Sequence, residues 1–94
     1  MIREVRLSSP VMRDIARGRV PIQVATKLQI WIDDVKDRGL EEVRRTPGYH
    51  DEPLKGSRAG QRSIRLNKTW RAIYDVHHGV AKFVQVEEVT PHKY

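Results

Sequence analysis

The stretch that decides the fold is residues 61–76, which read QRSIRLNKTWRAIYDV. Apolar and polar side chains alternate with a period of two over Gln61–Asn67 and again over Trp70–Val76, which predicts two strands. Asn67-Lys68-Thr69 between them favours a tight turn. The pattern therefore predicts an antiparallel hairpin.

The alternation gives each predicted strand an apolar face and a less apolar face. The apolar face carries Ile64 and Leu66 on the first strand and Trp70, Ala72, Tyr74 and Val76 on the second. The less apolar face carries Ser63 and Arg65 on the first strand and Arg71, Ile73 and Asp75 on the second. We expect the apolar faces to pack on the core, and Arg65 and Arg71 to share the other face.

A third strand follows the hairpin in the sequence. His77-His78-Gly79 predicts a second turn, and Val80–Val89 has the composition of a strand. Three consecutive strands joined by short turns predict an antiparallel meander.

Two helices are predicted before the meander. Ser9-Pro10 is typical of a helix N-cap followed by proline at the first helical position, and this helix should end at Gly18. The longer helix should run from Pro21 to about Arg38 and end at Gly39. Its apolar side chains recur at helical spacing, at Val24, Leu28, Trp31 and Val35.

The remaining segments complete the expected topology. Met1–Leu7 favours a first strand, Leu40–Arg45 a further turn or two of helix, and Pro47–Gly60 a loop. The predicted fold class is α+β, with two helices packed on one face of a four-stranded sheet. Residues 1–94 should form a single domain, and the cations of the meander should project from the open face.

Length and composition narrow the class of protein. The chain has 94 residues, of which 38% are hydrophobic and 32% charged, a balance typical of a soluble domain with one core. It has no cysteine, which excludes disulfides and thiolate metal sites. The longest uncharged stretch, Val20–Thr26, is too short for a transmembrane helix, and Met1-Ile2-Arg3-Glu4 does not begin a secretory signal. We therefore expect a cytoplasmic protein that does not contact a membrane.

The positive charge is concentrated in one segment. The formal net charge is +6, from 18 Lys and Arg against 12 Asp and Glu. Residues 53–74 contain six cations and no acid, while the other twelve cations are balanced by the twelve acids. Such clustering, rich in arginine, favours a polyanionic partner, because guanidinium groups bind phosphate oxygens bidentately.

Motifs for several other chemistries are incomplete. The glycine-rich residues 56–60 lack the Lys-Ser/Thr ending of a phosphate-binding loop. His50, Asp51 and Glu52 have ligand-type side chains but only one histidine and no spaced partner. His77 and His78 are adjacent, so in an extended segment they point in opposite directions. No metal ion or cofactor is expected.

The remaining reactive side chains are Arg, Lys, His and Tyr, which suit one metal-independent reaction. RNA is cleaved when its own 2′-hydroxyl attacks the adjacent phosphate. The protein must remove a proton from that hydroxyl, stabilise the charge on the phosphorane and protonate the leaving 5′-oxygen. Arginine is a fixed cation suited to the phosphorane, whereas histidine and tyrosine can transfer protons.

Several motifs occur together in one order along the chain. They are PGYHDEPLKG at residues 47–56, Arg58, GQRSIRLN at 60–67, WRAIY at 70–74 and EVTPHKY at 88–94. These segments resemble the RelE/HigB group of bacterial toxin–antitoxin killer proteins, within the RelE/ParE superfamily. The first blocks are similar to its PLKG…GxxSIRxN segment, the next to its WR or YR signature, and the last to its His/Tyr tail. The resemblance extends over nearly the whole chain and implies a RelE-like fold.

The resemblance also implies a function. Members of the group are ribosome-dependent endoribonucleases that cut mRNA in the ribosomal A site and so inhibit translation. A cognate antitoxin restrains them, here expected to be a HigA-like, helix-turn-helix DNA-binding protein. Carried over to this sequence, the catalytic positions are Arg65, Arg71, His92 and Tyr94. Lys93 separates the two tail residues, which leaves the assignment of general acid and general base open.

Contacts to RNA or the ribosome are expected from the loop and the basic segment. The candidates are His50, Lys55, Arg58, Arg62 and Lys68. Lys55 and His50 are also weaker candidates for the proton-transferring groups. For Lys55 and Arg62, contact with only the RNA backbone or ribosomal RNA is the favoured role.

Other interpretations stay open at this point. Arg71 could pair with Asp75 across its strand face, and Arg65 could be an ordinary solvated residue. A ParE-like DNA gyrase poison would share the fold without cutting RNA, and so would a non-catalytic RNA- or antitoxin-binding module. The basic strand pair and the His/Tyr tail favour cleavage, because a gyrase poison has no chemical need for them.

Overall fold

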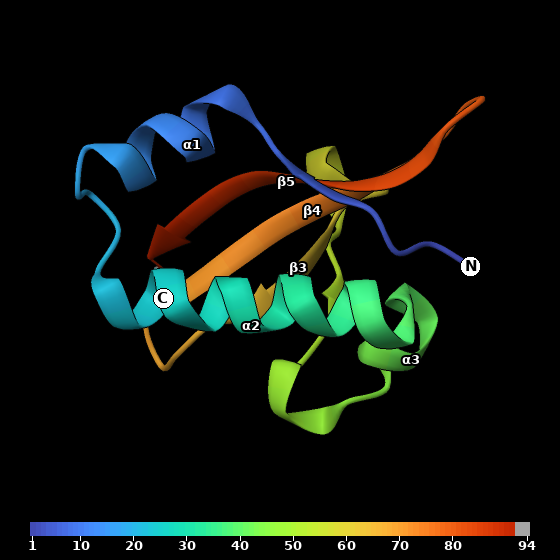
Figure 1. Cartoon of the computed structure of the whole chain (residues 1–94), viewed down its shortest axis with the longest axis horizontal. Helices are drawn as coiled ribbons and strands as arrows, with labels where there is room; N and C mark the ends of the chain where they lie inside the picture. The colour runs from blue at the N-terminus through green and yellow to red at the C-terminus, as the bar shows by residue number, and fades with distance from the viewer. Residues whose placement is uncertain (92–94) are drawn as a thin grey trace.

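A five-stranded mixed sheet and three α-helices make up the part of the chain that the computed structural model describes, residues 1–91 (Figure 1). The strand order across the sheet is β1-β5-β4-β3-β2. The elements, in chain order, are β1 (Val5–Leu7), α1 (Ser9–Ala16), α2 (Ile22–Arg38), α3 (Leu40–Arg44), the 3-10 turn η1 (Pro47–Tyr49), β2 (Glu52–Pro53), the 3-10 turn η2 (Gly56–Arg58), β3 (Arg62–Arg65), β4 (Trp70–His78) and β5 (Lys82–Pro91). The predicted α+β class is confirmed.

The predicted meander is present. β3 pairs with β4 and β4 with β5, both antiparallel. The first turn forms because the side-chain oxygen of Asn67 accepts hydrogen bonds from the backbone N–H groups of Thr69 and Trp70, both at 2.8 Å. An asparagine that bonds its own downstream backbone in this way stabilises a tight turn.

The sheet has one strand more than predicted. Glu52–Pro53, expected to lie in a loop, forms the edge strand β2 and pairs antiparallel with β3. A strand of two residues is too short to show an alternating pattern. At the other edge, β1 covers only Val5–Leu7 of the predicted Met1–Leu7 and runs parallel to β5.

The predicted turn at His77-His78-Gly79 is wrong. β4 continues through His78, and the chain reverses at residues 79–81, so that His77 faces Phe83 and His78 faces Lys82. The ring of His77 stacks on that of Phe83, with centroids 4.6 Å apart, and such cross-strand pairs extend a hairpin. The last strand is accordingly β5, Lys82–Pro91, instead of Val80–Val89.

The helices lie close to where the sequence places them. The N-cap of α1 is Ser8 and not Ser9: the Ser8 hydroxyl oxygen accepts a hydrogen bond from the backbone N–H of Val11. α2 ends at Gly39, whose φ of +84° allows the chain to turn directly into α3. Figure 1 shows α2 running the length of the molecule, with α3 folded back at its end.

One hydrophobic cluster joins the helices to one face of the sheet. Trp31 of α2 is fully buried, and its ring lies 5.3 Å from that of Tyr74. The sheet contributes Ile64, Ala72, Tyr74, Val84 and Val86 to this cluster, and Leu66 joins it from the turn after β3. The side chains that alternate with them therefore lie on the opposite face, where the candidate site is found.

None of the helices in the described part of the chain combines the length and the apolar character that crossing a bilayer requires.

Candidate functional site

Two arginines lie directly opposite each other on neighbouring strands. Arg65 on β3 and Arg71 on β4 are register partners in the ladder, so their side chains leave the sheet on the same face. Directly opposed like charges destabilise a strand pair. The shared face was predicted from the alternation, and the unfavourable pairing suggests that these charges have a function beyond the fold.

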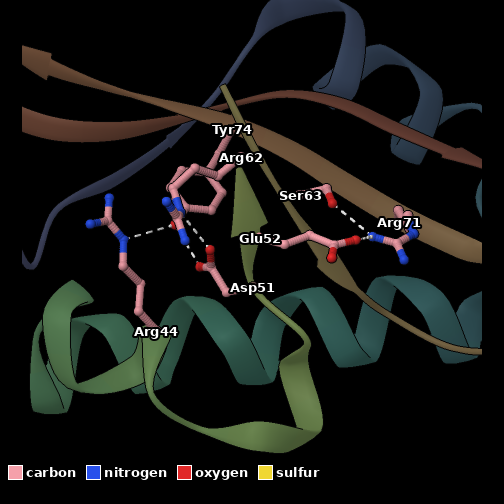
Figure 2. A network of polar contacts seen from close by, with 7 residues as sticks. All are labelled: Arg44, Asp51, Glu52, Arg62, Ser63, Arg71 and Tyr74. Atoms are coloured by element: carbon pink, nitrogen blue, oxygen red, sulfur yellow. Dashed lines mark hydrogen bonds and ion pairs between the residues drawn. The ribbon is translucent and has the colours of Figure 1, made fainter. Parts of the chain in front are cut away.

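Arg71 is held in place by two neighbours, which Figure 2 shows. Its Nη1 atom donates to the Ser63 hydroxyl oxygen at 2.7 Å and to a Glu52 carboxylate oxygen at 3.1 Å. The Arg71 side chain is 16% exposed. The alternative that Arg71 pairs with Asp75 is wrong, because Asp75 pairs with His77 instead.

His50 approaches the second arginine. The Nη1 atom of Arg65 lies 3.4 Å from the Nε2 atom of His50. His50 follows η1 and has a φ of +47°, the one non-glycine residue with positive φ in residues 1–91. This left-handed backbone conformation, which costs energy for a non-glycine residue, ends η1. The structure therefore places the loop histidine beside the strand arginines.

A cavity of about 190 Å³ opens on this face of the sheet. It is lined by Glu52, Leu54, Arg58, Ser63, Arg71, Ile73, Thr90 and Pro91. Arg58 is paired with Glu88 and also donates from Nε to the Gln61 side chain at 3.0 Å. The cavity is smaller than a site for a drug-sized ligand, so it has room for only one small group of a larger substrate.

Arg62 does not belong to this face. The prediction that the cations of the meander project from the open face is wrong for Arg62. Arg62 lies two residues before the buried Ile64 on β3, so both side chains leave the sheet on the helix side. Its Nε atom donates to the Asp51 carboxylate at 2.6 Å on the helix side of the sheet. Burial alone would lower the pKa of Arg62. The hydrogen bond to Asp51 and the negative charge of Asp51 act in the opposite direction, so the pKa of Arg62 is raised overall.

Asp51 is the centre of a buried polar network. Its other carboxylate oxygen accepts the Tyr74 hydroxyl proton at 2.6 Å, and Arg44 of α3 donates to the Tyr74 oxygen at 3.3 Å (Figure 2). Burial, and next the hydrogen bond to Asp51, raise the pKa of Tyr74 well above its ordinary value. Tyr74 is thus a neutral structural group and not a candidate acid or base.

This network positions the site on the other face. Asp51 and Glu52 are consecutive in an extended segment, so their side chains point to opposite faces of the sheet. Asp51 contacts Arg62 and Tyr74 on the helix side of the sheet, while Glu52 contacts Arg71 on the opposite face. Anchoring the first carboxylate therefore fixes where the second one lies.

The other predicted residues fall around the site or beyond the described part. Lys68 is exposed in the hairpin turn that joins the strands of Arg65 and Arg71, and Lys55 is exposed at the start of η2. His92 and Tyr94 lie outside the described residues. Pro91, the last residue that the structure describes, lines the cavity.

The sequence reasoning missed two residues of the site, Glu52 and Ser63. Ser63 lies two residues before Arg65 on β3, so the alternation of the strand could have predicted that both side chains share one face. The position of Glu52 was harder to predict from the sequence. Glu52 reaches the site only because β2 pairs with β3, which brings Glu52 opposite Ser63. The structure thus joins a carboxylate, a hydroxyl and two guanidinium groups on one face.

Solved structures with this architecture are known. The YoeB/ParE toxin from Agrobacterium tumefaciens is 23% identical, with a TM-score of 0.66 over 96% of this chain and 99% of that one. YafQ from E. coli is 20% identical, with a TM-score of 0.70 over 95% of this chain and 92% of that one. The chain has the RelE/ParE-superfamily toxin fold. The resemblance seen in the motifs is confirmed at the level of the fold.

Several structures with the RelE/ParE fold are complexes. The YoeB–YefM complex from Staphylococcus aureus is 16% identical, with a TM-score of 0.70 over 96% of this chain and 97% of that one. No protein-family model and no curated protein matches the sequence. Identities this low establish the fold, so function must be argued from the site.

Proposed function

We propose that this protein is the toxin of a type II toxin–antitoxin system and a ribosome-dependent mRNA endoribonuclease that inhibits translation. The observation that carries the proposal is the pair of opposed guanidinium groups, Arg65 and Arg71, beside the Glu52 carboxylate. Fixed cations next to a base suit a reaction in which charge develops on a phosphate while a hydroxyl loses its proton. The RelE/ParE toxin fold agrees with this interpretation.

Each group has a role in the proposed reaction. The scissile phosphate binds Arg65 and Arg71 and displaces Glu52 from its ion pair with Arg71. The released carboxylate accepts the proton of the RNA 2′-hydroxyl, whose oxygen then forms a bond to phosphorus. The bond from phosphorus to the 5′-oxygen breaks, and a general acid protonates that oxygen. The products are a 2′,3′-cyclic phosphate and a 5′-hydroxyl, with no metal ion in the reaction.

The tail supplies the general acid in this proposal. Pro91 lines the cavity, and His92 and Tyr94 follow it in the sequence. Arginine is a poor proton donor, because its pKa lies above 12. His50, beside Arg65, is the alternative donor within the described residues.

A cognate antitoxin is the proposed partner besides the ribosome and mRNA. The similar structures include complexes named YoeB–YefM, DinJ–YafQ and RelBE2. We propose a HigA-like antitoxin with a helix-turn-helix DNA-binding domain, whose acidic segment covers the basic face. Since the ribosome is the target, the proposed location is the cytoplasm.

The decisive experiment adds purified protein to translating ribosomes and maps the 5′ ends of the mRNA. Loss of one fixed donor to a developing oxyanion lowers a rate about 10²–10³-fold, so Arg71→Ala should slow single-turnover cleavage by that factor. Arg13→Ala, at an exposed arginine of α1, is the matched control and should cleave normally. Circular dichroism checks that both variants fold. Undiminished cleavage by folded Arg71→Ala would falsify this role.

The same assay separates the alternatives. Replacing the 2′-hydroxyl by hydrogen at the cut nucleotide should stop the reaction, and cleavage of that substrate at the normal rate would exclude the mechanism. Inhibition of DNA gyrase with intact mRNA would identify a ParE-like poison. Ribosome binding without cleavage or gyrase inhibition would identify a non-catalytic module.

A further inference from the structure

A second cluster of polar side chains lies on the open face, away from the cavity. It consists of Asp75 and His77 on β4 and Glu87 on β5. One ligand atom from each, the imidazole nitrogen and two carboxylate oxygens, all lie within 4.8 Å of one another. None of the three lines the cavity beside Arg71. This cluster therefore needs an explanation of its own.

The backbone brings these three residues together in two ways. Asp75 and His77 are two apart on one strand, so they share a face, and the Nε2 atom of His77 lies 3.1 Å from an Asp75 oxygen. Glu87 is an extra residue in β5, at an irregularity of the strand pairing. Tyr74 pairs with Val86 and Ile73 pairs with Glu88, so Glu87 between them has no partner in β4. A β-bulge of this kind redirects a side chain.

The histidine is further oriented by its neighbours. Its ring stacks on Phe83 with an interplanar angle of 7°. The Arg6 guanidinium lies over the Phe83 ring, 3.8 Å from the centroid, and is itself paired with Glu4, which offsets its charge. The imidazole of His77 is thus held with its Nε2 atom toward the carboxylates.

The donor set matches one class of ligand. A neutral imidazole and two carboxylates carry a charge of −2, which balances a divalent cation. Imidazole favours Zn²⁺ and its transition-metal neighbours over Mg²⁺ and Ca²⁺, which prefer oxygen ligands. Ligands about 2.1 Å from a tetrahedral ion lie about 3.4 Å apart. The three ligand atoms now lie between 3.1 Å and 4.8 Å apart, close to this spacing, and their side chains are partly or fully exposed, which leaves room for the small rotations that coordination needs.

We propose that Asp75, His77 and Glu87 bind a divalent transition-metal ion of the Zn²⁺ class, which links β4 to β5 across the bulge. Gln85 now donates to one Glu87 oxygen at 2.6 Å, so Glu87 coordinates through its other oxygen or releases this bond. Water completes the coordination shell. The site is independent of the proposed ribonuclease chemistry, which uses no metal.

Calorimetric titration of the purified full chain with ZnCl₂ tests the proposal. The expected result is saturable binding of one ion per chain. Loss of groups that only orient metal ligands costs 10–100-fold in affinity, so loss of a ligand in His77→Gln or Glu87→Gln should weaken binding at least about tenfold. His78→Gln is the matched control, because it removes the adjacent histidine on the same strand, and His92→Gln controls for the tail. Both should bind normally.

Thermal unfolding gives an independent readout. Ligands that bind the native state raise the unfolding temperature, so Zn²⁺ should raise it for the wild-type chain and His78→Gln but not for His77→Gln. The proposal is overturned if His77→Gln binds as tightly as the wild type, or if His78→Gln or His92→Gln loses binding equally. It is also overturned if binding does not saturate below millimolar Zn²⁺.

Discussion

Replacing Asp51 by alanine should destabilise the fold more than any exposed acidic substitution. The Asp51 side chain is 1% exposed and accepts hydrogen bonds from Arg62 and Tyr74, both at 2.6 Å. Its removal leaves a partly buried guanidinium without its anion and a buried phenol without its acceptor. Both groups then lose interactions that water replaces only in part.

The expected magnitude follows from the surroundings of these two groups. Breaking a fully buried ion pair costs about 3–5 kcal/mol. Two features reduce that figure here: the Arg62 side chain is 27% exposed and borders a cleft of about 320 Å³, and Tyr74 keeps its contact with Arg44. We therefore expect Asp51→Ala to lower the free energy of unfolding by about 2–4 kcal/mol. Asp51→Asn keeps an acceptor for Tyr74 and should cost about half as much.

Urea unfolding followed by tryptophan fluorescence measures this change, since Trp31 lies 5.3 Å from the Tyr74 ring. In a domain of this size the melting temperature should fall by about 10–25 °C. Asp37→Ala, at an exposed acid of α2, is the control. If the unpaired charge of Arg62 causes the loss of stability, the double variant Asp51→Ala/Arg62→Met should recover part of the free energy of unfolding. A cost equal to that of Asp37→Ala, or no recovery in the double variant, refutes this reasoning.

Three further predictions concern single residues. Ser8→Ala should lower the free energy of unfolding by about 1 kcal/mol, measured by urea titration, because it removes the N-cap of α1. Burial raises the pKa of Tyr74, so the folded chain keeps a proton that the unfolded chain loses near pH 10. Stability should therefore fall as pH rises above 10, and Tyr74→Phe should reduce that slope by about 1.4 kcal/mol per pH unit in alkaline urea titrations. If the tail supplies the general acid, the variant that lacks this acid, His92→Ala or Tyr94→Phe, should slow single-turnover cleavage by about 10²–10⁴-fold, and normal rates in both would move that role to His50.

The sequence predicted those parts of the fold that repeat a pattern over several residues. The alternation over Gln61–Asn67 and Trp70–Val76 correctly predicted the hairpin, its turn and the shared face of Arg65 and Arg71, although β3 covers only Arg62–Arg65 and β4 extends to His78. The helical spacing from Val24 to Val35 gave α2. In each case the local pattern and the tertiary packing require the same side chains to be buried, so the pattern is sufficient.

The features that were missed depend on contacts between distant segments. β2 consists of two residues and exists only because β3 is present to pair with it. The continuation of β4 through His78 depends on the stacking of His77 on Phe83. Neither contact produces a periodic pattern in the sequence from which it could be predicted. The same is true of Glu52, because its position in the site depends on the pairing of β2 with β3.

The ion pairs also change how the basic segment should act on RNA. Three of its six cations, Arg58, Arg62 and Arg71, are each paired with an acid from outside the segment, so the local field is weaker than the formal charge indicates. Within residues 1–91, Lys55 and Lys68 are exposed and make no ion pair, so they suit contacts with the RNA backbone. A phosphate must displace a carboxylate to reach Arg71. Any anion can bind the lysines, but a phosphate positioned by the ribosome is better placed to displace the carboxylate, and this would couple the proposed cleavage to a ribosome-bound substrate.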